Sequence, residues 1–145
     1  MYAEVLGGGE PFTWTTFESD VSQMVVVRDI PFTSFCAHHL LPFTGTAHVG
    51  YVPNGRVVGL SKLARCVQTV AARPQVQEEL TDEVARLVDH HVAPLGVGVV
   101  LDARHSCMEL RGPRAVGAIT TTSSLRGVFL DKPEARAEFM AMIRR

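Results

Sequence analysis

The sequence lacks several features that would indicate other classes of protein. No apolar run is long enough to span a bilayer, and the opening residues MYAEVLGGGEPF do not have the basic-then-apolar order of a signal peptide. The formal net charge is only −1 and the basic residues are scattered, so the chain has no electrostatic footprint for nucleic acid or an anionic membrane. These absences predict a cytoplasmic protein whose partner is a small molecule.

Disulfide chemistry is also disfavoured. The three cysteines, Cys36, Cys66 and Cys107, are an odd number in a chain without a secretory mark, which leaves free thiols or metal ligands. Cys66 lies on an apolar helical stripe and is expected to be a core thiol. At 145 residues the chain is long enough to bury a core without a metal, so any metal is expected to serve chemistry.

The chain shows no repeats and no linker, which predicts one domain over residues 21–145 behind a loosely attached N-terminal arm, residues 1–20. β-Branched runs predict strands at 24–30 and 46–52, and the turn pair Asn54-Gly55 predicts a tight hairpin to a strand at 56–60. Ser61 is expected to cap a helix over 62–72, and a second amphipathic helix is expected over 75–92.

The remaining pattern predicts strands at 97–110 and 115–125 and a final helix at 134–143. The order strand-strand-helix-helix-strand-strand-helix is typical of an α+β domain, in which an antiparallel sheet has two helices packed on one face. A small open sheet of this kind exposes its edges. Oligomerisation that closes the edges into a larger barrel is therefore expected.

The densest chemistry lies in SFCAHHLLPF, residues 34–43. Cys36 and His39 have the close spacing of two ligands on one turn, and a third ligand is expected from His105-Ser106-Cys107, where alternate residues of a strand share a face. A Cys, His, Cys set without a fourth protein ligand is typical of a catalytic zinc site. The alternative, two unrelated core thiols, has similar weight at this point. Of two adjacent imidazoles such as those of His38 and His39, one can serve as a metal ligand and the other as a proton carrier.

Two further groups of polar residues suggest an anionic substrate. Ser61, Lys62 and Arg65 stand on the first turn of a predicted helix, and Arg111 follows Cys107, so basic groups are expected to converge near the metal and bind a polyphosphate. The alternative is a solvated basic face. Gln77 and Glu78 open the long helix, where an acid also simply complements the helix dipole.

Several motifs together resemble the GTP cyclohydrolase I family. They run in order from Met24 to the C-terminus: MVVVRDIPFTSFCAHHLLPFTGTAHVGYVPNGRVVGLSKLARCVQTVAARPQVQEEL, HSCMELRGPR and TTTSSLRGVF. The resemblance implies a tunnelling fold, in which antiparallel sheets of several subunits form a barrel coated by helices. It also implies a homodecamer of two stacked pentamers with active sites shared between subunits.

The resemblance also implies residue roles. It makes Cys36, His39 and Cys107 the zinc ligands and His38 and His105 the catalytic histidines, in the hydrolysis of GTP to formate and 7,8-dihydroneopterin triphosphate. His38 is expected to protonate nitrogen 7 of the guanine, and His105 to assist loss of formate and opening of the ribose. Substrate contacts carried over in the same way are Gln77 and Glu78 for the guanine, Ser61 for the ribose, and Lys62, Arg65 and Arg111 for the triphosphate.

The sequence departs from the family pattern in two places. Ala37 stands where the family usually has a glutamate beside the first zinc cysteine, which removes a carboxylate near the metal. The family's N-terminal helices, which add basic residues to the triphosphate pocket, have no counterpart before MYAEVLGGG, so weaker triphosphate binding is expected. Three functions stay open: the cyclohydrolase, in a folate or deazapurine pathway; another enzyme of the fold acting on a related purine or pterin, such as the nitrile reductase of queuosine synthesis; and a non-catalytic zinc-binding relative.

Overall fold

The computed structural model of the protein describes residues 12–144. Its centre is a five-stranded sheet in the order β5-β2-β3-β6-β7, in which every pair is antiparallel except the short parallel pair of β5 with β2. The strands are β2 (Val25–Cys36), β3 (Pro42–Val52), β5 (Pro74–Gln75), β6 (Gly96–His105) and β7 (Thr120–Gly127). The expected α+β class is therefore confirmed.

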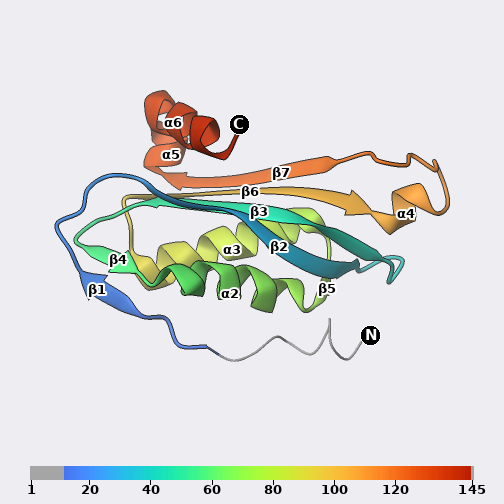
Figure 1. Ribbon diagram of the computed structural model, residues 1–145, viewed down its shortest axis with the longest axis horizontal. Helices are drawn as coiled ribbons and strands as arrows, with labels where there is room; N and C mark the ends of the chain where they lie inside the picture. Colours follow the sequence, from blue (N-terminus) through green and yellow to red (C-terminus); the bar gives the residue numbers. More distant parts are fainter. Residues whose placement is uncertain (1–11, 145) are drawn as a thin grey trace.

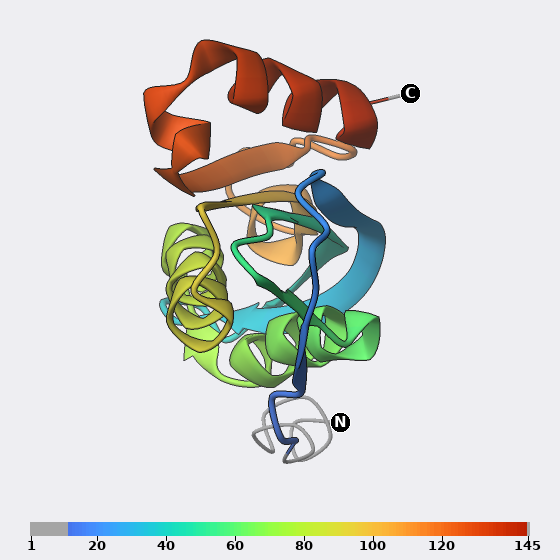
Figure 2. The ribbon, with the colours of Figure 1, turned by 90° about the vertical axis from the view of Figure 1, so that its left-hand side faces the viewer.

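Helices cover the two faces of this sheet unequally (Figures 1 and 2). The long helices α2 (Leu60–Ala71) and α3 (Gln77–Val92) lie side by side on one face, α2 against β2 and α3 against β6 and β7. On the other face, α5 (Val128–Asp131) and α6 (Pro133–Ile143) pack over one end of the sheet. The predicted pair of helices on one face is confirmed, and the final helix lies on the opposite side.

The core fills the space between the sheet and the helix pair, because each element turns an apolar face inward. β3 and β6 contribute alternating buried side chains such as Val49 and Leu101, while α2 and α3 contribute apolar stripes that include Leu63 and Val84. Cys66 is 1% exposed in this core, as its place on the stripe predicted. A smaller cluster around Phe129 and Phe139 fixes α5 and α6 on the other face.

The N-terminal part of the chain differs from the prediction of a loose arm. Residues 1–11 of that arm lie outside the described residues, but β1 (Thr16–Glu18) pairs with β4 (Arg56–Val58) in a separate two-stranded sheet. Trp14 also stacks on His91, near the end of α3, with ring centroids 4.8 Å apart. The chain turns at Gly55, as the hairpin prediction requires, but β4 does not pair with β3. The predicted pairing is therefore wrong, because β4 pairs with β1 instead.

Two boundaries differ in ways that affect the site. The strand predicted over 97–110 ends at His105, and the short helix α4 (Ser106–Glu109) carries Cys107, so the alternation that placed His105 and Cys107 on one strand face is wrong. The predicted cap at Ser61 is also wrong. Helix α2 begins two residues earlier than predicted, with Gly59 as its N-cap and no hydrogen bond from a capping side chain.

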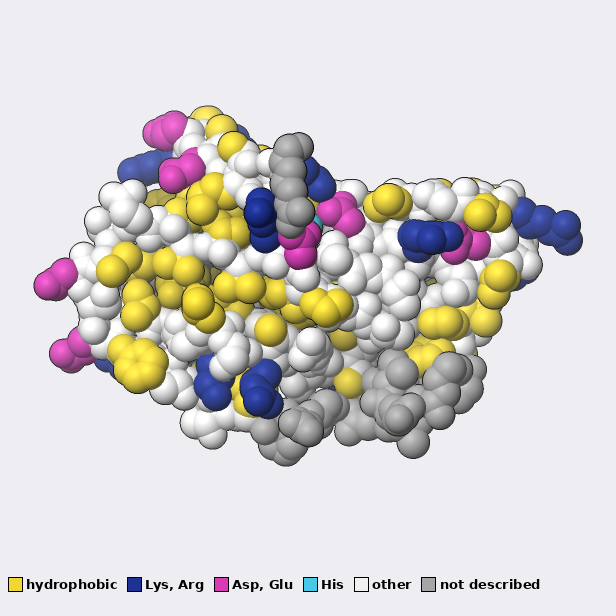
Figure 3. All heavy atoms as spheres, in the orientation of Figure 1, with side chains coloured by type: hydrophobic (Ala, Val, Ile, Leu, Met, Phe, Trp, Pro, Cys, Tyr) yellow, Lys and Arg dark blue, Asp and Glu magenta, His cyan; other side chains and the backbone are white. Residues whose placement is uncertain are grey.

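Large hydrophobic side chains remain exposed on this single chain. They are Phe17, Val21, Leu40, Leu60, Leu95, Leu110, Val116, Ile119, Leu130 and Met142. On the face seen in Figure 3, yellow side chains extend across the middle of the molecule between few charged groups. Within residues 12–144, the helices are all too short or too polar to cross a membrane.

Candidate active site

The loop between β2 and β3 presents the ligand-rich stretch at one end of the sheet. Cys36 is the last residue of β2, and its backbone pairs with both ends of the loop: its N–H donates to Leu41 O, and its carbonyl accepts from the N–H of Leu40. Leu40 has a positive φ of 52° where the chain turns back. His38 and His39 are exposed on this turn, with ring centroids 6.4 Å apart. The turn thus separates the two imidazoles.

Three of the predicted ligands meet at this end of the sheet. Ligand atoms of Cys36, His39 and Cys107 all lie within 4.8 Å of one another, and Cys36 Sγ is 3.7 Å from His39 Nδ1. In a tetrahedral site with Zn–S of about 2.3 Å and Zn–N of about 2.0 Å, neighbouring ligand atoms are roughly 3.5–3.8 Å apart. The two thiols and the imidazole therefore fit a zinc ion after small side-chain adjustments.

The electrostatics of the cluster suit a cation. Burial and the adjacent thiol of Cys36 raise the pKa of Cys107, while Arg111 opposes that shift. Two neighbouring thiols resist becoming two thiolates unless a positive ion lies between them, and zinc binds thiolates. This effect places the charge of Arg111 near Cys107, and its contact with a triphosphate stays a prediction.

His105 is held rigidly beside the cluster. Its ring stacks on Phe43, the residue opposite it on β3, with centroids 4.5 Å apart and planes inclined by 5°. Its Nε2 lies 2.6 Å from Oε1 of Gln77. Burial lowers the pKa of the His105 imidazole, and the exposed carboxylate of Glu78 acts in the opposite direction. The structure thus brings His105, Gln77 and Glu78 together near the metal ligands.

The basic residues of α2 do not lie beside the candidate metal ligands of the same chain. The helix begins near Tyr51, whose hydroxyl accepts a hydrogen bond from the N–H of Val58. Tyr51 and Phe43, the residue opposite His105, are about eight residues apart on β3, or roughly 26 Å at ~3.3 Å per residue.

Ser61 and Lys62, in the first turn of α2, therefore lie toward the end of the sheet opposite Cys36, and Arg65 lies one turn farther along the helix. Their convergence on the metal therefore stays a prediction, one that needs the α2 residues of a neighbouring copy.

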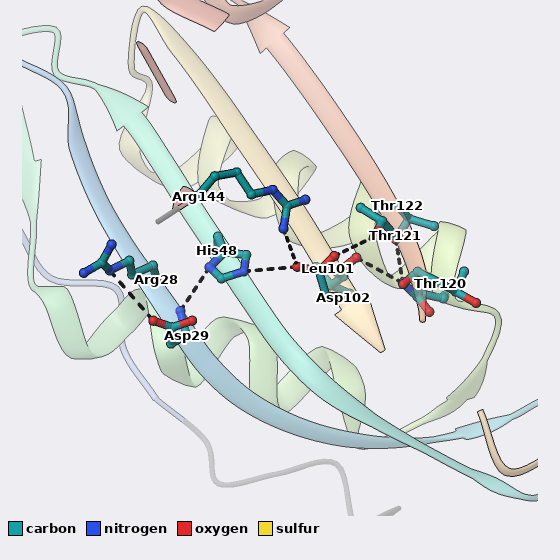
Figure 4. Close-up of polar contacts among 10 residues, drawn as sticks. Arg28, Asp29, His48, Leu101, Asp102, Thr120, Thr121, Thr122 and Arg144 are labelled. Atoms are coloured by element: carbon teal, nitrogen blue, oxygen red, sulfur yellow. Dashed lines mark hydrogen bonds and ion pairs between the residues drawn. The ribbon is translucent and has the colours of Figure 1, made fainter. Parts of the chain in front are cut away.

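A second polar cluster, which sequence reasoning missed, crosses the sheet farther from the metal ligands (Figure 4). His48 is 3% exposed; its Nδ1 accepts from the N–H of Asp29, and its Nε2 lies 3.4 Å from Asp102 Oδ2. Asp102 also accepts from Thr121 and from Arg144 at 3.0 Å. Burial alone would raise the pKa of Asp102, but these hydrogen bonds outweigh it and lower the pKa. Only the register of β3, β6 and β7 reveals this cluster.

The fold and the site together define a class of protein: an α+β domain with a Cys-His-Cys group that could hold a metal ion, beside a clamped histidine. The profile of the family GTP cyclohydrolase I matches residues 1–144. The chain is 50% identical over 149 residues to GTP cyclohydrolase 1 of Rhodopirellula baltica, covering 100% of this chain and 65% of that relative. The chain belongs to the GTP cyclohydrolase I family.

Other relatives agree with this assignment. GTP cyclohydrolase 1 of Hydrogenobaculum sp. is 52% identical, covering 92% of this chain and 74% of the relative, and that of Brevibacillus brevis is 52% identical, covering 99% and 80%. The chain thus spans between about two thirds and four fifths of the length of these relatives. The solved structure of the archaeosine synthase QueF-Like in the apo form has a TM-score of 0.58 at 19% identity, covering 76% of this chain and 97% of that one, which shows the fold alone.

Proposed function

We propose that the protein is a zinc-dependent GTP cyclohydrolase, which hydrolyses GTP to formate and 7,8-dihydroneopterin triphosphate. The observation that carries this proposal is the meeting of Cys36, His39 and Cys107 beside His105, in a chain of the GTP cyclohydrolase I family. The free thiols suit the cytoplasmic location that we propose. The product would enter a folate or a deazapurine pathway.

Cys36, His39 and Cys107 would hold the zinc ion. When bound, zinc supplies Lewis-acid chemistry, which activates a water molecule at neutral pH. The three ligands come from the end of β2, the following turn and α4, so the fold of the sheet end creates the site. Ala37 contributes no carboxylate to this surrounding, in contrast to the glutamate usual in the family.

The two histidines outside the ligand set would move protons. His38 is exposed on the same turn as His39, so its ring is accessible to a bound purine and would protonate nitrogen 7 as the imidazole ring of guanine opens. His105 is half-buried and clamped by Phe43 and Gln77, which suits a group that exchanges a proton in the later steps. His38 and His105 would each transfer a proton to or from a different atom of the substrate, so the two imidazole rings need different positions in the site.

Substrate recognition would use residues from two copies of the chain. Glu78 is exposed next to His105 and would accept hydrogen bonds from the guanine ring nitrogen and amine, and Arg111 would contact the triphosphate. Ser61, Lys62 and Arg65 lie at the other end of the sheet, so a neighbouring copy would supply them. The exposed hydrophobic side chains of the single chain support assembly. We propose a homodecamer of two pentamers with the sites at subunit interfaces.

The direct test is to incubate purified protein of known metal content with GTP. The proposal expects zinc at about one per chain, together with formate and a pterin that fluoresces after oxidation. Chelation should abolish turnover, and added zinc should restore it. Zinc at the expected content without turnover would refute the proposal and favour a non-catalytic zinc-binding role.

A further inference from the structure

The inference concerns Gln77, the first residue of α3. Its neighbour Glu78 is exposed, whereas the side chain of Gln77 is buried, with 1% of the residue accessible. A purine in the site would need an accessible edge of the Gln77 amide to bond with it. That burial leaves no such edge, so the substrate contact expected from the sequence does not explain this residue.

The surroundings of Gln77 fix which end of its amide faces His105. Nε2 lies 3.3 Å from Leu101 O, 3.0 Å from Thr120 O and 3.0 Å from Thr122 Oγ1. Two of these three atoms are carbonyl oxygens, which can only accept a hydrogen bond. An amide turned the other way would set its oxygen against both carbonyls. Gln77 Oε1 therefore points to His105.

The hydrogen bonds of two threonine hydroxyl groups support the same orientation of the Gln77 amide. Thr81 Oγ1 donates to the backbone carbonyl of Gln77 at 2.8 Å, so the hydroxyl of Thr122, 2.7 Å away, must donate to Thr81 Oγ1. Thr122 Oγ1 is then free to accept from Gln77 Nε2. Thr120 and Thr122 lie on β7 opposite β6, and Figure 4 shows both beside Leu101. Each proton in these hydrogen bonds has one position.

These directions determine the tautomer of His105. Gln77 Oε1 cannot donate, so the 2.6 Å contact requires a proton on His105 Nε2. The stacked ring of Phe43 fixes the plane of the imidazole at the same time. We propose that Gln77 is a positioning residue, which holds His105 with Nε2 protonated and leaves Nδ1 as the nitrogen that exchanges a proton with the substrate.

This inference rests on the proposed function for its kinetic consequence. Gln77→Met keeps a side chain of similar length and removes both amide contacts. It should lower kcat by at least about tenfold, the size of effect expected for a displaced proton-transfer group, with KM for GTP changed by less than about twofold. Glu78→Gln, one residue along the same helix turn, is the matched control and should mainly raise KM.

A second pair of variants tests the same hydrogen bonds from β7, in case Gln77→Met does not fold. Thr122→Val removes the hydroxyl while keeping the shape of the side chain, and Thr122→Ser keeps the hydroxyl. Thr122→Val should lower kcat and Thr122→Ser should restore it, both with nearly unchanged KM. A raised KM with unchanged kcat in Gln77→Met would overturn the inference, since that result belongs to a substrate contact.

The tautomer can be read without any turnover. In zinc-loaded protein labelled with ¹⁵N-histidine, NMR should show the proton of neutral His105 on Nε2, and Gln77→Met should redistribute it between the two nitrogens. A proton on Nδ1 in the unaltered protein would overturn the inference. Because this measurement needs no GTP, it separates failure of the inference from failure of the proposed activity.

Discussion

Mixed oligomers of two inactive variants should recover activity. Lys62→Ala removes the cation at the start of α2, and Cys107→Ser removes a ligand at the opposite end of the sheet. The β3 residues at these two ends, Phe43 and Tyr51, are roughly 26 Å apart at ~3.3 Å per residue, so we infer that the two groups at one substrate come from different copies. If neighbouring copies each contribute one end, then a mixed assembly contains some sites in which both contributions are intact.

The size of the recovery follows from random assembly. With equal amounts of the two variants, the chain that supplies the metal ligands of a site has an intact Cys107 in about half of the cases. The neighbouring chain independently has an intact Lys62 in about half of the cases, so about one site in four is intact. Co-expression with two different tags, isolation of mixed oligomers and measurement of formate release from GTP would provide the assay. The expected rate is about a quarter of the rate of the unaltered protein per chain.

The matched control combines two changes in the same half of the site. Lys62→Ala mixed with Arg65→Ala should recover less than Lys62→Ala mixed with Cys107→Ser, because no mixed site has both α2 residues intact. Each preparation must first show the oligomer size of the unaltered protein by light scattering. Mixed oligomers of Lys62→Ala and Cys107→Ser that stay as inactive as their parents would refute the shared-site reasoning.

Three further predictions concern individual side chains. His38→Ala should retain zinc but lose turnover by about 100-fold or more, because the role proposed for His38 is that of a proton carrier and not of a ligand; loss of zinc in metal analysis would contradict this. Burial raises the pKa of Cys66 to about 12, so mass spectrometry should find it unalkylated by iodoacetamide in the folded protein and alkylated after unfolding; rapid native labelling would contradict its burial. Asp102→Asn should destabilise the protein at pH 7 by about 1–2 kcal/mol, since the carboxylate accepts from Thr121 and Arg144. The pKa of Asp102 is lowered from 3.8, so in denaturant titrations this difference should shrink as pH falls below that value; a pH-independent difference would contradict it.

Local patterns predicted much of the fold and the close approach of Cys36 to His39. Cys36 and His39 are three residues apart on one turn, so predicting that they could bind one ion together needed only local geometry. The apolar stripes of α2 and α3 were readable for the same reason, including the burial of Cys66. Each of these features depends on residues within one or two turns of each other.

Features that depend on strand register could not be predicted in this way. Gln77 contacts Leu101 and Thr122, which are 24 and 45 residues away in the chain, and only the pairing of β6 with β7 brings them together. An isolated glutamine at a helix start carries no signal of such a contact. The partner of β4 was missed because the pattern of Thr16–Glu18 is too short to mark a strand.

The most direct test of the proposed activity is the formate released per GTP consumed by zinc-loaded protein, compared with the same protein after chelation and with Cys107→Ser. The account predicts about one formate per GTP from the loaded protein, none after chelation, and neither zinc nor formate with Cys107→Ser. Full zinc content with GTP left intact, or turnover unaffected by chelation and by Cys107→Ser, would contradict it.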